Sequence, residues 1–264
     1  MGVLNVTPDS FGDSAHSTDA SAAVDAAVRM EGEGADLIDI GGESTRPGAD
    51  PVDVNEELSR VLPVVGCAAR RLRVPISIDT YKADVARAAL DAGAAIVNDI
   101  SGLLYEPHLA RVVAERRAAL VLMHTRGRSK TMYGEAVYAD LIGEVAGELR
   151  QRIQCATAAG VPIQQIVIDP GIGFAKRPPH SYGVLARLPE LADALDRPLL
   201  VGPSRKSFMR EALNGRPAPE RDWGTAAAVA AAVLAGVHIV RVHAVAEMIQ
   251  VVRVAEEIRR MAKG

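Results

Sequence analysis

The feature that most constrains the fold of this chain is an alternation of short apolar runs with longer segments of helical period, which occurs eight times. The short runs are rich in Val, Ile and Leu and are almost continuously apolar, which is typical of parallel strands buried on both faces. They predict strands at residues 2–5, 37–40, 75–78, 95–97, 119–123, 165–168, 198–201 and 238–242.

The segments between these runs carry apolar residues at the three- and four-residue spacing of amphipathic helices. They predict helices over residues 20–34, 54–69, 82–92, 106–115, 138–159, 182–195, 207–213, 223–234 and 245–261. An open, doubly wound sheet would show the same alternation, but eight units within 264 residues favour a closed (β/α)8 barrel, the TIM barrel of the α/β class. No change of composition divides the chain, so we expect a single domain over residues 1–264.

The composition limits the kinds of partner. Hydrophobic residues make up 48% of the chain but aromatic residues only 3%, so the core has to be aliphatic. A net charge of −3 gives no electrostatic case for nucleic acid or an anionic membrane. No apolar run reaches the roughly 18 residues that a membrane span needs, and the N-terminal segment lacks the basic and apolar regions of a signal peptide. We therefore expect a cytoplasmic protein without nucleic-acid or membrane partners.

Polar residues follow almost every predicted strand. In a (β/α)8 barrel the active site is built from the C-terminal strand ends and the loops after them, so we expect these side chains around one rim. Any single one is equally well explained as a helix cap, and Asp99, just before Ser101, fits that alternative. Recurrence at nearly every strand nevertheless indicates a site. The candidates are Asn5, Glu43, Thr45, Arg46, Asp79, Asn98, Asp99, His124, Asp169, Ser204, Lys206, Arg241 and His243.

One subset of these residues suits a flat, nitrogen-rich heterocycle. Asp79, Asn98 and Asp169 end the third, fourth and sixth predicted strands. A carboxylate can accept two N–H bonds from an amidine-like edge, and an amide can both donate and accept. We expect these three side chains to bind the edge of such a ring.

A second subset suits an anion such as phosphate. Arg205 and Lys206 follow a Gly-Pro-Ser turn, and we expect the helix that begins at Ser207 to direct free N–H groups at the anion. Arg241 and His243 add cationic donors at the end of the eighth strand.

Asn5 and His124 each have two interpretations. Asn5 is a neutral oxygen donor beside the basic subset, and Mg²⁺ needs few protein ligands besides phosphate oxygens and water; a plain hydrogen-bonding role is the alternative. For His124 we favour a strand-end histidine with satisfied hydrogen bonds over a catalytic one. Two lone histidines without acidic ligand spacing do not indicate zinc. The sequence contains no Gly-x-Ser-x-Gly, no P-loop and no dinucleotide fingerprint at the first strand.

The strand-end residues lie in motifs through which the chain resembles the dihydropteroate synthase family over nearly all of its length. The motifs are GVLNVTPDSF at 2–11, DIGGESTRPG at 39–48, SIDT at 77–80, NDISG at 98–102, LMHTRG at 122–127, IDPGIGFAK at 168–176, GPSRKSF at 202–208 and RVH at 241–243. One motif alone, such as RVH, would be a weak signal. The full set in the family's order is a strong one.

The resemblance implies a transferase reaction of folate biosynthesis. Family members join 7,8-dihydropterin-6-ylmethyl diphosphate to p-aminobenzoate and release diphosphate. The C–O bond is implied to break first, in an SN1-like step with Mg²⁺ on the diphosphate, before the aniline nitrogen attacks the pterin methyl cation. Sulfonamides, which mimic p-aminobenzoate, are implied as inhibitors.

The family's functional residues fall on matching positions of this chain. The implied pterin-binding residues are Asp79, Asn98, Ile100, Met123, Asp169, Phe174, Gly202 and Lys206. The implied diphosphate-binding residues are Asn5, Thr45, Arg241 and His243, with Asn5 also the implied metal ligand. The implied p-aminobenzoate contacts are Phe11, Arg46, Pro47 and Ser207. The implied catalytic residues are Asp13, Arg241, His243 and Lys206, with Asp13 as a loop acid that closes over the metal and the cation.

The resemblance also implies a homodimer, because the family usually pairs through its last helices. The final predicted helix carries an apolar stripe made of Val245, Met248, Ile249, Val252 and Ala255. Every outer helix of a barrel packs such a stripe on the strands, so the stripe by itself does not indicate a dimer.

The chain departs from the family pattern within two motifs. Ala244 follows Arg-Val-His where the family usually has Asp, and Ser14-Ala15 stands where it commonly has two glycines. Two other functions therefore stay open. One is a pterin-binding methyltransferase, which shares the barrel but passes a methyl group to a corrinoid protein. The other is a homologue that binds pterins without catalysis.

Overall fold

Strands and helices alternate along the whole described chain. The computed structural model describes residues 1–7, 16–44 and 48–262. The strands are β1 (Gly2–Asn5), β2 (Ile38–Gly41), β3 (Ile76–Asp79), β4 (Ile96–Asp99), β5 (Ala119–Met123), β6 (Ile166–Asp169), β7 (Leu200–Val201) and β8 (Ile239–Val240). The α-helices are α2 (His16–Gly32), α3 (Val54–Arg71), α4 (Ala83–Asp91), α5 (Leu109–Arg116), α6 (Leu141–Ala158), α7 (Pro178–Ala186), α8 (Leu188–Leu195), α9 (Asp222–Leu234) and α10 (Val245–Met261). Short 3₁₀ helices are η1 (Ile163–Gln165), η2 (Ser207–Met209) and η3 (Ala218–Glu220).

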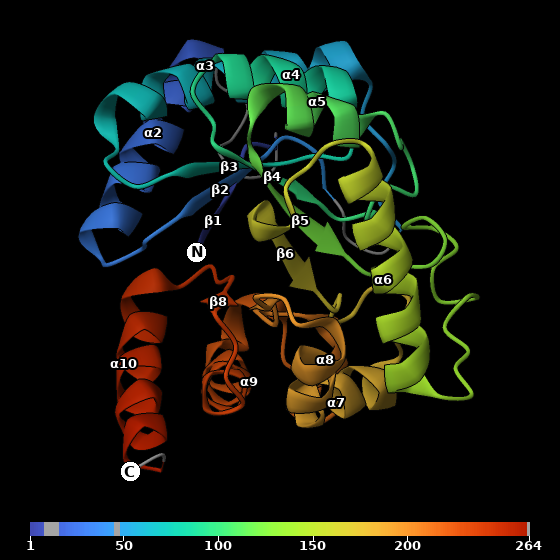
Figure 1. Ribbon diagram of the computed structural model, residues 1–264. Helices are drawn as coiled ribbons and strands as arrows, with labels where there is room; N and C mark the ends of the chain where they lie inside the picture. The colour runs from blue at the N-terminus through green and yellow to red at the C-terminus, as the bar shows by residue number, and fades with distance from the viewer. Residues whose placement is uncertain (8–15, 45–47, 263–264) are drawn as a thin grey trace.

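The strands close into a barrel. β1 to β6 form one parallel sheet in chain order, and β7 pairs with β8. Single bridges connect the two sheets, from Ile168 of β6 to Leu199 and from Gly2 of β1 to Val242. The ring is therefore complete, and the predicted (β/α)8 barrel is confirmed (Figure 1).

Two predicted helices are wrong. Residues 182–195 form parts of α7 and α8, which are separated at Arg187, where φ is −119° and ψ is 25°. Pro189 explains the break, because proline has no N–H to donate and its ring clashes with the preceding helical turn. Over residues 207–213 only the three-residue η2 forms. Asn214 and Gly215, with φ of 53° and 81°, turn the chain back directly afterwards.

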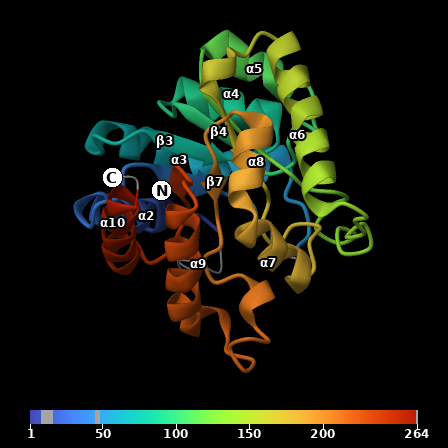
Figure 2. The same cartoon turned by 60° about the horizontal axis from the view of Figure 1, so that its bottom comes forward.

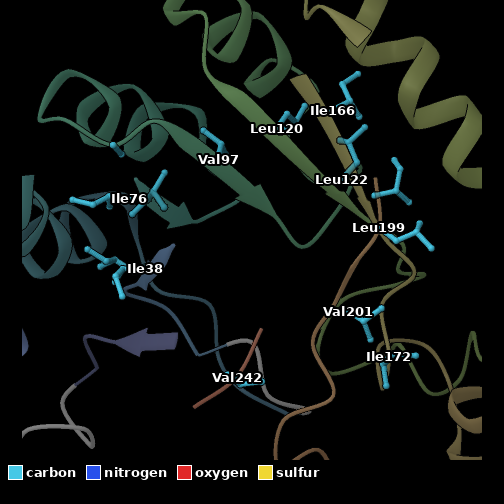
Figure 3. Packing of buried hydrophobic residues seen from close by; sticks show 14 of the residues in the cluster. Ile38, Ile76, Val97, Leu120, Leu122, Ile166, Ile172, Leu199, Val201 and Val242 are labelled. Atoms are coloured by element: carbon cyan, nitrogen blue, oxygen red, sulfur yellow. The ribbon is translucent and has the colours of Figure 1, made fainter. Parts of the chain in front are cut away.

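The outer face of the barrel is aliphatic. Residues such as Ile38 and Ile40 of β2 belong to one large cluster with side chains of the surrounding helices (Figure 3). Because side chains alternate between the two faces of a strand, Asp39, which lies between these isoleucines, points into the barrel.

The inner face changes character along the strands. Near the N-terminal ends a smaller apolar cluster fills the interior, made of Met1, Leu37, Ile96, Val121, Val167, Leu200 and Ile239. Further along, the inner positions are polar and buried, and they include Asp39, Ser77, Asp79, Asn98 and Asp169. The barrel therefore has an apolar floor and a polar mouth.

The helices surround the barrel, with α2 to α5 in chain order over the first strands and α9 packed against α10 (Figures 1 and 2). None of the described helices is long and apolar enough to cross a membrane. Asp53 caps α3 by accepting the N–H of Glu56 at 3.0 Å. The N-cap of α10 is Ala244, which has no side chain that can cap.

Three of the five residues of the predicted apolar stripe of α10 pack inside the monomer. Val245, Met248 and Ala255 are buried, which leaves them unavailable to a partner chain, whereas Ile249 and Val252 are partly buried. A different set of apolar side chains is exposed on α9 and α10, namely Leu234, Val254, Ile258 and Met261.

Candidate active site

The predicted heterocycle-binding residues lie together at the barrel mouth. Asp79 pairs in register with Asn98 between β3 and β4, and Met123 pairs with Asp169 between β5 and β6. The exposed fractions are only 8% for Asp79, 3% for Asn98 and 5% for Asp169. Met123 and Ile100 are buried beside them. The mouth thus offers two carboxylates and an amide in apolar surroundings.

A buried ion cluster joins this group to Arg241. Its Nε donates to Asp39 Oδ2 at 2.6 Å, and its Nη2 donates to Asp79 Oδ2 at 2.7 Å. Asn98 Nδ2 donates to the same Asp39 oxygen at 3.0 Å. The other oxygens, Oδ1 of Asp39 and Oδ1 of Asp79, are buried and receive no hydrogen bond from the described residues.

The cluster changes the protonation behaviour of its members. Burial disfavours the charged form of Arg241, but Asp39 and Asp79 outweigh burial and raise the pKa of the guanidinium. Burial raises the pKa of Asp79, and the charge of Arg241 opposes this only in part. Arg241 is therefore charged at neutral pH.

Asp39 is a site residue that the sequence reasoning missed. It lies inside β2 and is fully buried, whereas the candidates predicted from the sequence were residues at strand ends. The available signal was the alternation of the strand, since an aspartate between two outward isoleucines has to face the interior. A carboxylate buried there needs partners, which marks it as part of a polar site.

Lys206 and Phe174 form one wall of the mouth. Lys206 Nζ lies 4.3 Å from the centroid of the Phe174 ring and donates to the carbonyl oxygen of Ile172. Burial lowers the pKa of Lys206 to about 8, although Asp169 favours the charged amine. Burial raises the pKa of Asp169, against the effect of Lys206.

The loop after β6 follows the edge of the site closely. Gly171 donates its N–H to Asp169 Oδ1 at 2.7 Å. Its φ is 70°, and a Cβ there would lie 2.0 Å from the carbonyl oxygen of His124. Only glycine fits this position, because any side chain would clash with backbone.

His124 lies in a hydrogen-bond network behind the wall, which agrees with its interpretation as a satisfied histidine. Its Nε2 is 3.1 Å from Glu148 Oε2, and its Nδ1 is 2.8 Å from Lys176 Nζ. Lys176 also donates to the carbonyl oxygen of Phe174 at 3.3 Å. Burial lowers the pKa of His124 to about 4. A neutral ring whose two nitrogens both have partners is not available as a general acid or base.

Asp99 serves its own loop, but it does not cap the next helix as the alternative predicted, because α5 begins at Leu109 and its N-cap is His108. Its Oδ1 accepts the N–H and the hydroxyl of Ser101 at 2.8 and 2.7 Å, and its Oδ2 accepts the N–H of Leu103 at 2.6 Å. The side chain is 0% exposed and thus belongs to the framework of the site.

Arg241 and His243, two of the residues predicted to bind diphosphate, follow β8, which lies next to β1. Ser204 Oγ accepts the backbone N–H of His243 at 3.2 Å and lies 2.9 Å from its Nδ1, which fixes the imidazole ring. Asn5 ends β1, the strand that the bridge from Gly2 to Val242 joins to the segment after β8. Gly202 directly follows β7, and a Cβ added to Gly202 would lie 3.6 Å from Arg241 Cβ.

The predicted anion site at a helix start is wrong in part. Arg205 is engaged by Asp222, with hydrogen bonds of 2.8 and 2.7 Å from Nε and Nη2. η2 is a single 3₁₀ turn, which lacks the aligned dipole of a full helix. Ser207 is exposed and lines a cleft of about 400 Å³ together with Tyr133 and Phe208.

Glu43 supports the loop after β2. It accepts the N–H of Val52 at 3.2 Å and the hydroxyl of Tyr81 at 2.9 Å. It also pairs with Lys82, which pairs with Glu57 as well. The remaining predicted site residues lie outside the described residues, namely Phe11, Asp13, Thr45, Arg46 and Pro47.

The chain matches a protein family whose description names binding of a heterocycle, which agrees with the heterocycle site at the barrel mouth. Residues 1–243 match the family described as "Pterin binding enzyme". This match covers well over half of the chain.

Individual relatives narrow the class. A dihydropteroate synthase of Synechocystis sp. is 47% identical over 260 residues, which are 98% of this chain and 90% of the relative. The Yersinia pestis dihydropteroate synthase, solved with a sulfonamide drug, has a TM-score of 0.92 and 42% identity over 98% of this chain and 94% of its own. The Xanthomonas albilineans enzyme, solved with 4-aminobenzoic acid, has a TM-score of 0.91 and 41% identity over 98% and 92% of the two chains. The chain belongs to the dihydropteroate synthase family of pterin-binding enzymes and is a transferase.

Proposed function

We propose that this chain transfers the dihydropterin-6-ylmethyl group from its diphosphate to p-aminobenzoate, which yields 7,8-dihydropteroate and diphosphate. The observation that carries the proposal is the buried cluster at the mouth, where Arg241 donates to Asp79 and to Asp39, and Asn98 donates to the same Asp39 oxygen. The Synechocystis relative carries the name of this activity, and the Xanthomonas relative binds 4-aminobenzoic acid in its crystal structure.

The proposed pterin site has acceptor oxygens for a ring edge rich in N–H groups. Asp79 Oδ1 receives no hydrogen bond from the described residues, and Asp169 has one oxygen left after Gly171 is bonded to Oδ1. A carboxylate can bind an amidine-like edge through two parallel hydrogen bonds. Phe174 and Lys206 are the proposed contacts of the ring face and of its acceptor atoms.

We propose that the C–O bond of the pterin diphosphate breaks first and that its electron pair leaves on the diphosphate oxygen. Arg241 and His243 stabilise the negative charge that develops there. The aniline nitrogen then donates its lone pair to the pterin methyl cation, which forms the C–N bond, and the nitrogen releases one proton to water. Asp13 is the proposed carboxylate beside the cation. The proposed contacts of p-aminobenzoate are Phe11, Arg46, Pro47 and Ser207.

Mg²⁺ is the proposed metal ion, with Asn5 as its protein ligand. Among residues 1–7, 16–44 and 48–262, no three His, Cys, Asp or Glu side chains form a group that could hold a metal. A neutral amide oxygen at a strand end, beside a site for diphosphate, fits a cation that keeps its waters and binds mainly through phosphate oxygens. When bound, Mg²⁺ would neutralise charge on the diphosphate, which Arg241 and His243 orient from the protein side.

Measurement of diphosphate release and dihydropteroate formation, with and without Mg²⁺, tests this proposal. We expect release only when both substrates and the metal are present. A pterin-binding methyltransferase would release no diphosphate. A protein that only binds pterins would show affinity for the pterin by calorimetry and form no product.

Sulfonamides provide an independent test of the second substrate. The Yersinia relative was solved with such a drug. We expect a sulfonamide to raise the apparent KM for p-aminobenzoate without changing kcat. Purely noncompetitive inhibition would contradict a shared site.

We also propose that the chain forms a homodimer through α9 and α10. The exposed side chains of Leu234, Val254, Ile258 and Met261 support this, because apolar residues gathered on neighbouring helices gain from burial against a second copy. Light scattering after gel filtration should give twice the monomer mass for the natural chain and the monomer mass for Ile258→Asp. An unchanged mass in the variant would exclude this face.

A further inference from the structure

Asp39 contacts two parts of the proposed substrate site from inside the barrel. It is 0% exposed, and its Oδ2 accepts hydrogen bonds from Asn98 Nδ2 at 3.0 Å and from Arg241 Nε at 2.6 Å. These partners are 59 and 202 residues away along the chain. One carboxylate oxygen therefore connects the proposed pterin-binding amide with the proposed diphosphate-binding guanidinium.

The bond to Asp39 determines which end of the Asn98 amide is left for a ligand. A carboxylate only accepts hydrogen bonds, so the group that faces it is the NH₂ of the amide. The carbonyl oxygen of Asn98 is then the remaining polar atom, and it accepts an N–H from a ring. Without the carboxylate the amide can turn over and offer a donor, which a ring N–H cannot use.

The same carboxylate orients Arg241. The guanidinium is planar, so contacts at two of its nitrogens fix the plane. Nε bonds to Asp39 and Nη2 bonds to Asp79, and no hydrogen bond joins Nη1 to the described residues. Nη1 is thus the donor that remains for a phosphate oxygen.

We propose that Asp39 is a positioning residue for the transfer reaction: it keeps the acceptor end of Asn98 toward the pterin and the Nη1 edge of Arg241 toward the leaving diphosphate. This role rests on the proposed function of the site. The competing explanation is a structural one. The Arg241–Asp39 pair also connects β8 with β2 across β1, where a single bridge closes the barrel, so the pair could act only as a brace.

Three variants separate these explanations. Asp39→Ala removes both hydrogen bonds, and Asp39→Asn keeps an acceptor oxygen but removes the charge. Asp222→Ala is the matched control, because it removes another aspartate that accepts two hydrogen bonds from an arginine, Arg205, at 2.8 and 2.7 Å, and Asp222 begins the outer helix α9. Calorimetry with 6-hydroxymethyl-7,8-dihydropterin, which carries no diphosphate, measures the Asn98 side. The kcat for diphosphate release measures the Arg241 side.

We expect Asp39→Ala to weaken binding of the dihydropterin about tenfold and to lower kcat about 100-fold, as for loss of charged hydrogen bonds to reacting groups. Asp39→Asn should recover most of the dihydropterin affinity but little of kcat, because the amide of Asn98 still has its acceptor while Arg241 loses one of its two counter-charges and keeps only Asp79. Asp222→Ala should leave both values unchanged.

Double variants provide the decisive measurement. In an Asn98→Ala background, Asp39→Ala should no longer affect dihydropterin affinity, and in an Arg241→Ala background it should no longer affect kcat. A brace would instead lower the melting temperature, leave kcat of the folded protein unchanged, and give additive effects in both backgrounds, which would overturn the proposal.

Two results would change which measurement decides: a variant that does not fold, and a protein that releases no diphosphate. If Asp39→Ala does not fold, Asp39→Asn decides alone: near-natural dihydropterin affinity with reduced kcat supports the role, and unchanged kcat overturns it. The affinity measurement needs no turnover. Coupling of Asp39 to Asn98 in a protein that releases no diphosphate would therefore reject the proposed function while leaving this half of the positioning role intact.

Discussion

Asp99 and Asp169 are both buried aspartates at C-terminal strand ends, yet the protein uses them differently. Both oxygens of Asp99 accept hydrogen bonds from its own loop, two from Ser101 and one from Leu103. Asp169 accepts one from Gly171 at Oδ1, and no hydrogen bond from a described residue reaches Oδ2. Buried acceptors are normally satisfied within the protein. For these two strand-end aspartates, an unused acceptor, rather than burial itself, therefore separates the residue proposed to bind the pterin from the one that supports a loop.

Several substitutions test whether a buried residue acts on the ligand or supports a loop. Among them, Arg241→Ala should have the largest effect. It removes the cation proposed to stabilise the leaving group, so kcat should fall about 100- to 1,000-fold, as for loss of a charge-stabilising donor. Affinity for the dihydropterin should fall much less. Steady-state kinetics and calorimetry give the two values, and equal losses would contradict the assigned role. Arg205→Ala is a suitable control, since that guanidinium is paired with Asp222.

Asp99→Ala should act on stability instead of on ligand binding. It leaves the buried N–H groups of Ser101 and Leu103 without an acceptor, which costs about 2–4 kcal/mol of the free energy of unfolding. Urea unfolding measures this loss. Dihydropterin affinity of the folded protein should change little. A variant that keeps its stability and loses its affinity would show that Asp99 had been classified wrongly.

Asp169→Asn should give the opposite pattern. The amide preserves the shape but replaces a charged acceptor, so dihydropterin binding should weaken by about 1.5–3 kcal/mol. Calorimetry at one pH measures the change, and urea unfolding of the same variant serves as the control. Unchanged affinity would remove Asp169 from the pterin site.

The amine of Lys206 should make the affinity for the pterin depend on pH. Burial lowers its pKa to about 8, so the charged form is present below this pH and is lost as the pH rises through it. If the pterin binds only to the charged form, affinity should fall up to about tenfold between pH 7 and pH 9. Lys206→Met should bind more weakly at pH 7 and show a flatter profile. An unchanged slope in this variant would assign the titration to another group.

Ala244→Asp should have the smallest effect and a positive one. The new carboxylate at the N-cap of α10 can accept a free N–H of the first helical turn, as Asp53 does for α3. An N-cap of this kind stabilises by about 1 kcal/mol. Thermal unfolding should show a modest rise in melting temperature. A rise in kcat without this stabilisation would mean that residue 244 acts on the site directly.

The sequence was sufficient for the barrel because strand and helix periods follow from which residues are apolar. It could not reveal the break between α7 and α8, since the prediction gave more weight to the apolar spacing over residues 182–195 than to Pro189. The short extent of β7 and β8 also depends on pairing across the closure, which is a tertiary property.

Site residues at strand ends could be found from position alone, but their use could not. Asp99 accepts hydrogen bonds from Ser101 and Leu103 in a loop where Gly102 and Leu103 have positive φ angles of 57° and 67°. Residue types alone do not predict this loop conformation. Asp39 was detectable in principle from the alternation along β2, whereas its link to Arg241 depends on closing the barrel from end to end.

The apolar floor of the barrel has a consequence for the order of events. Because aliphatic side chains close the N-terminal end, a ring that reaches Asp79 and Asp169 has a single way in and the same way out. The depth at which each substrate is expected to bind then determines the order of binding. The deeper substrate has to enter before the shallower one, and the joined product has to leave last, after the diphosphate at the rim has departed. The proposed reaction is thus expected to follow an ordered kinetic scheme with the pterin diphosphate bound first.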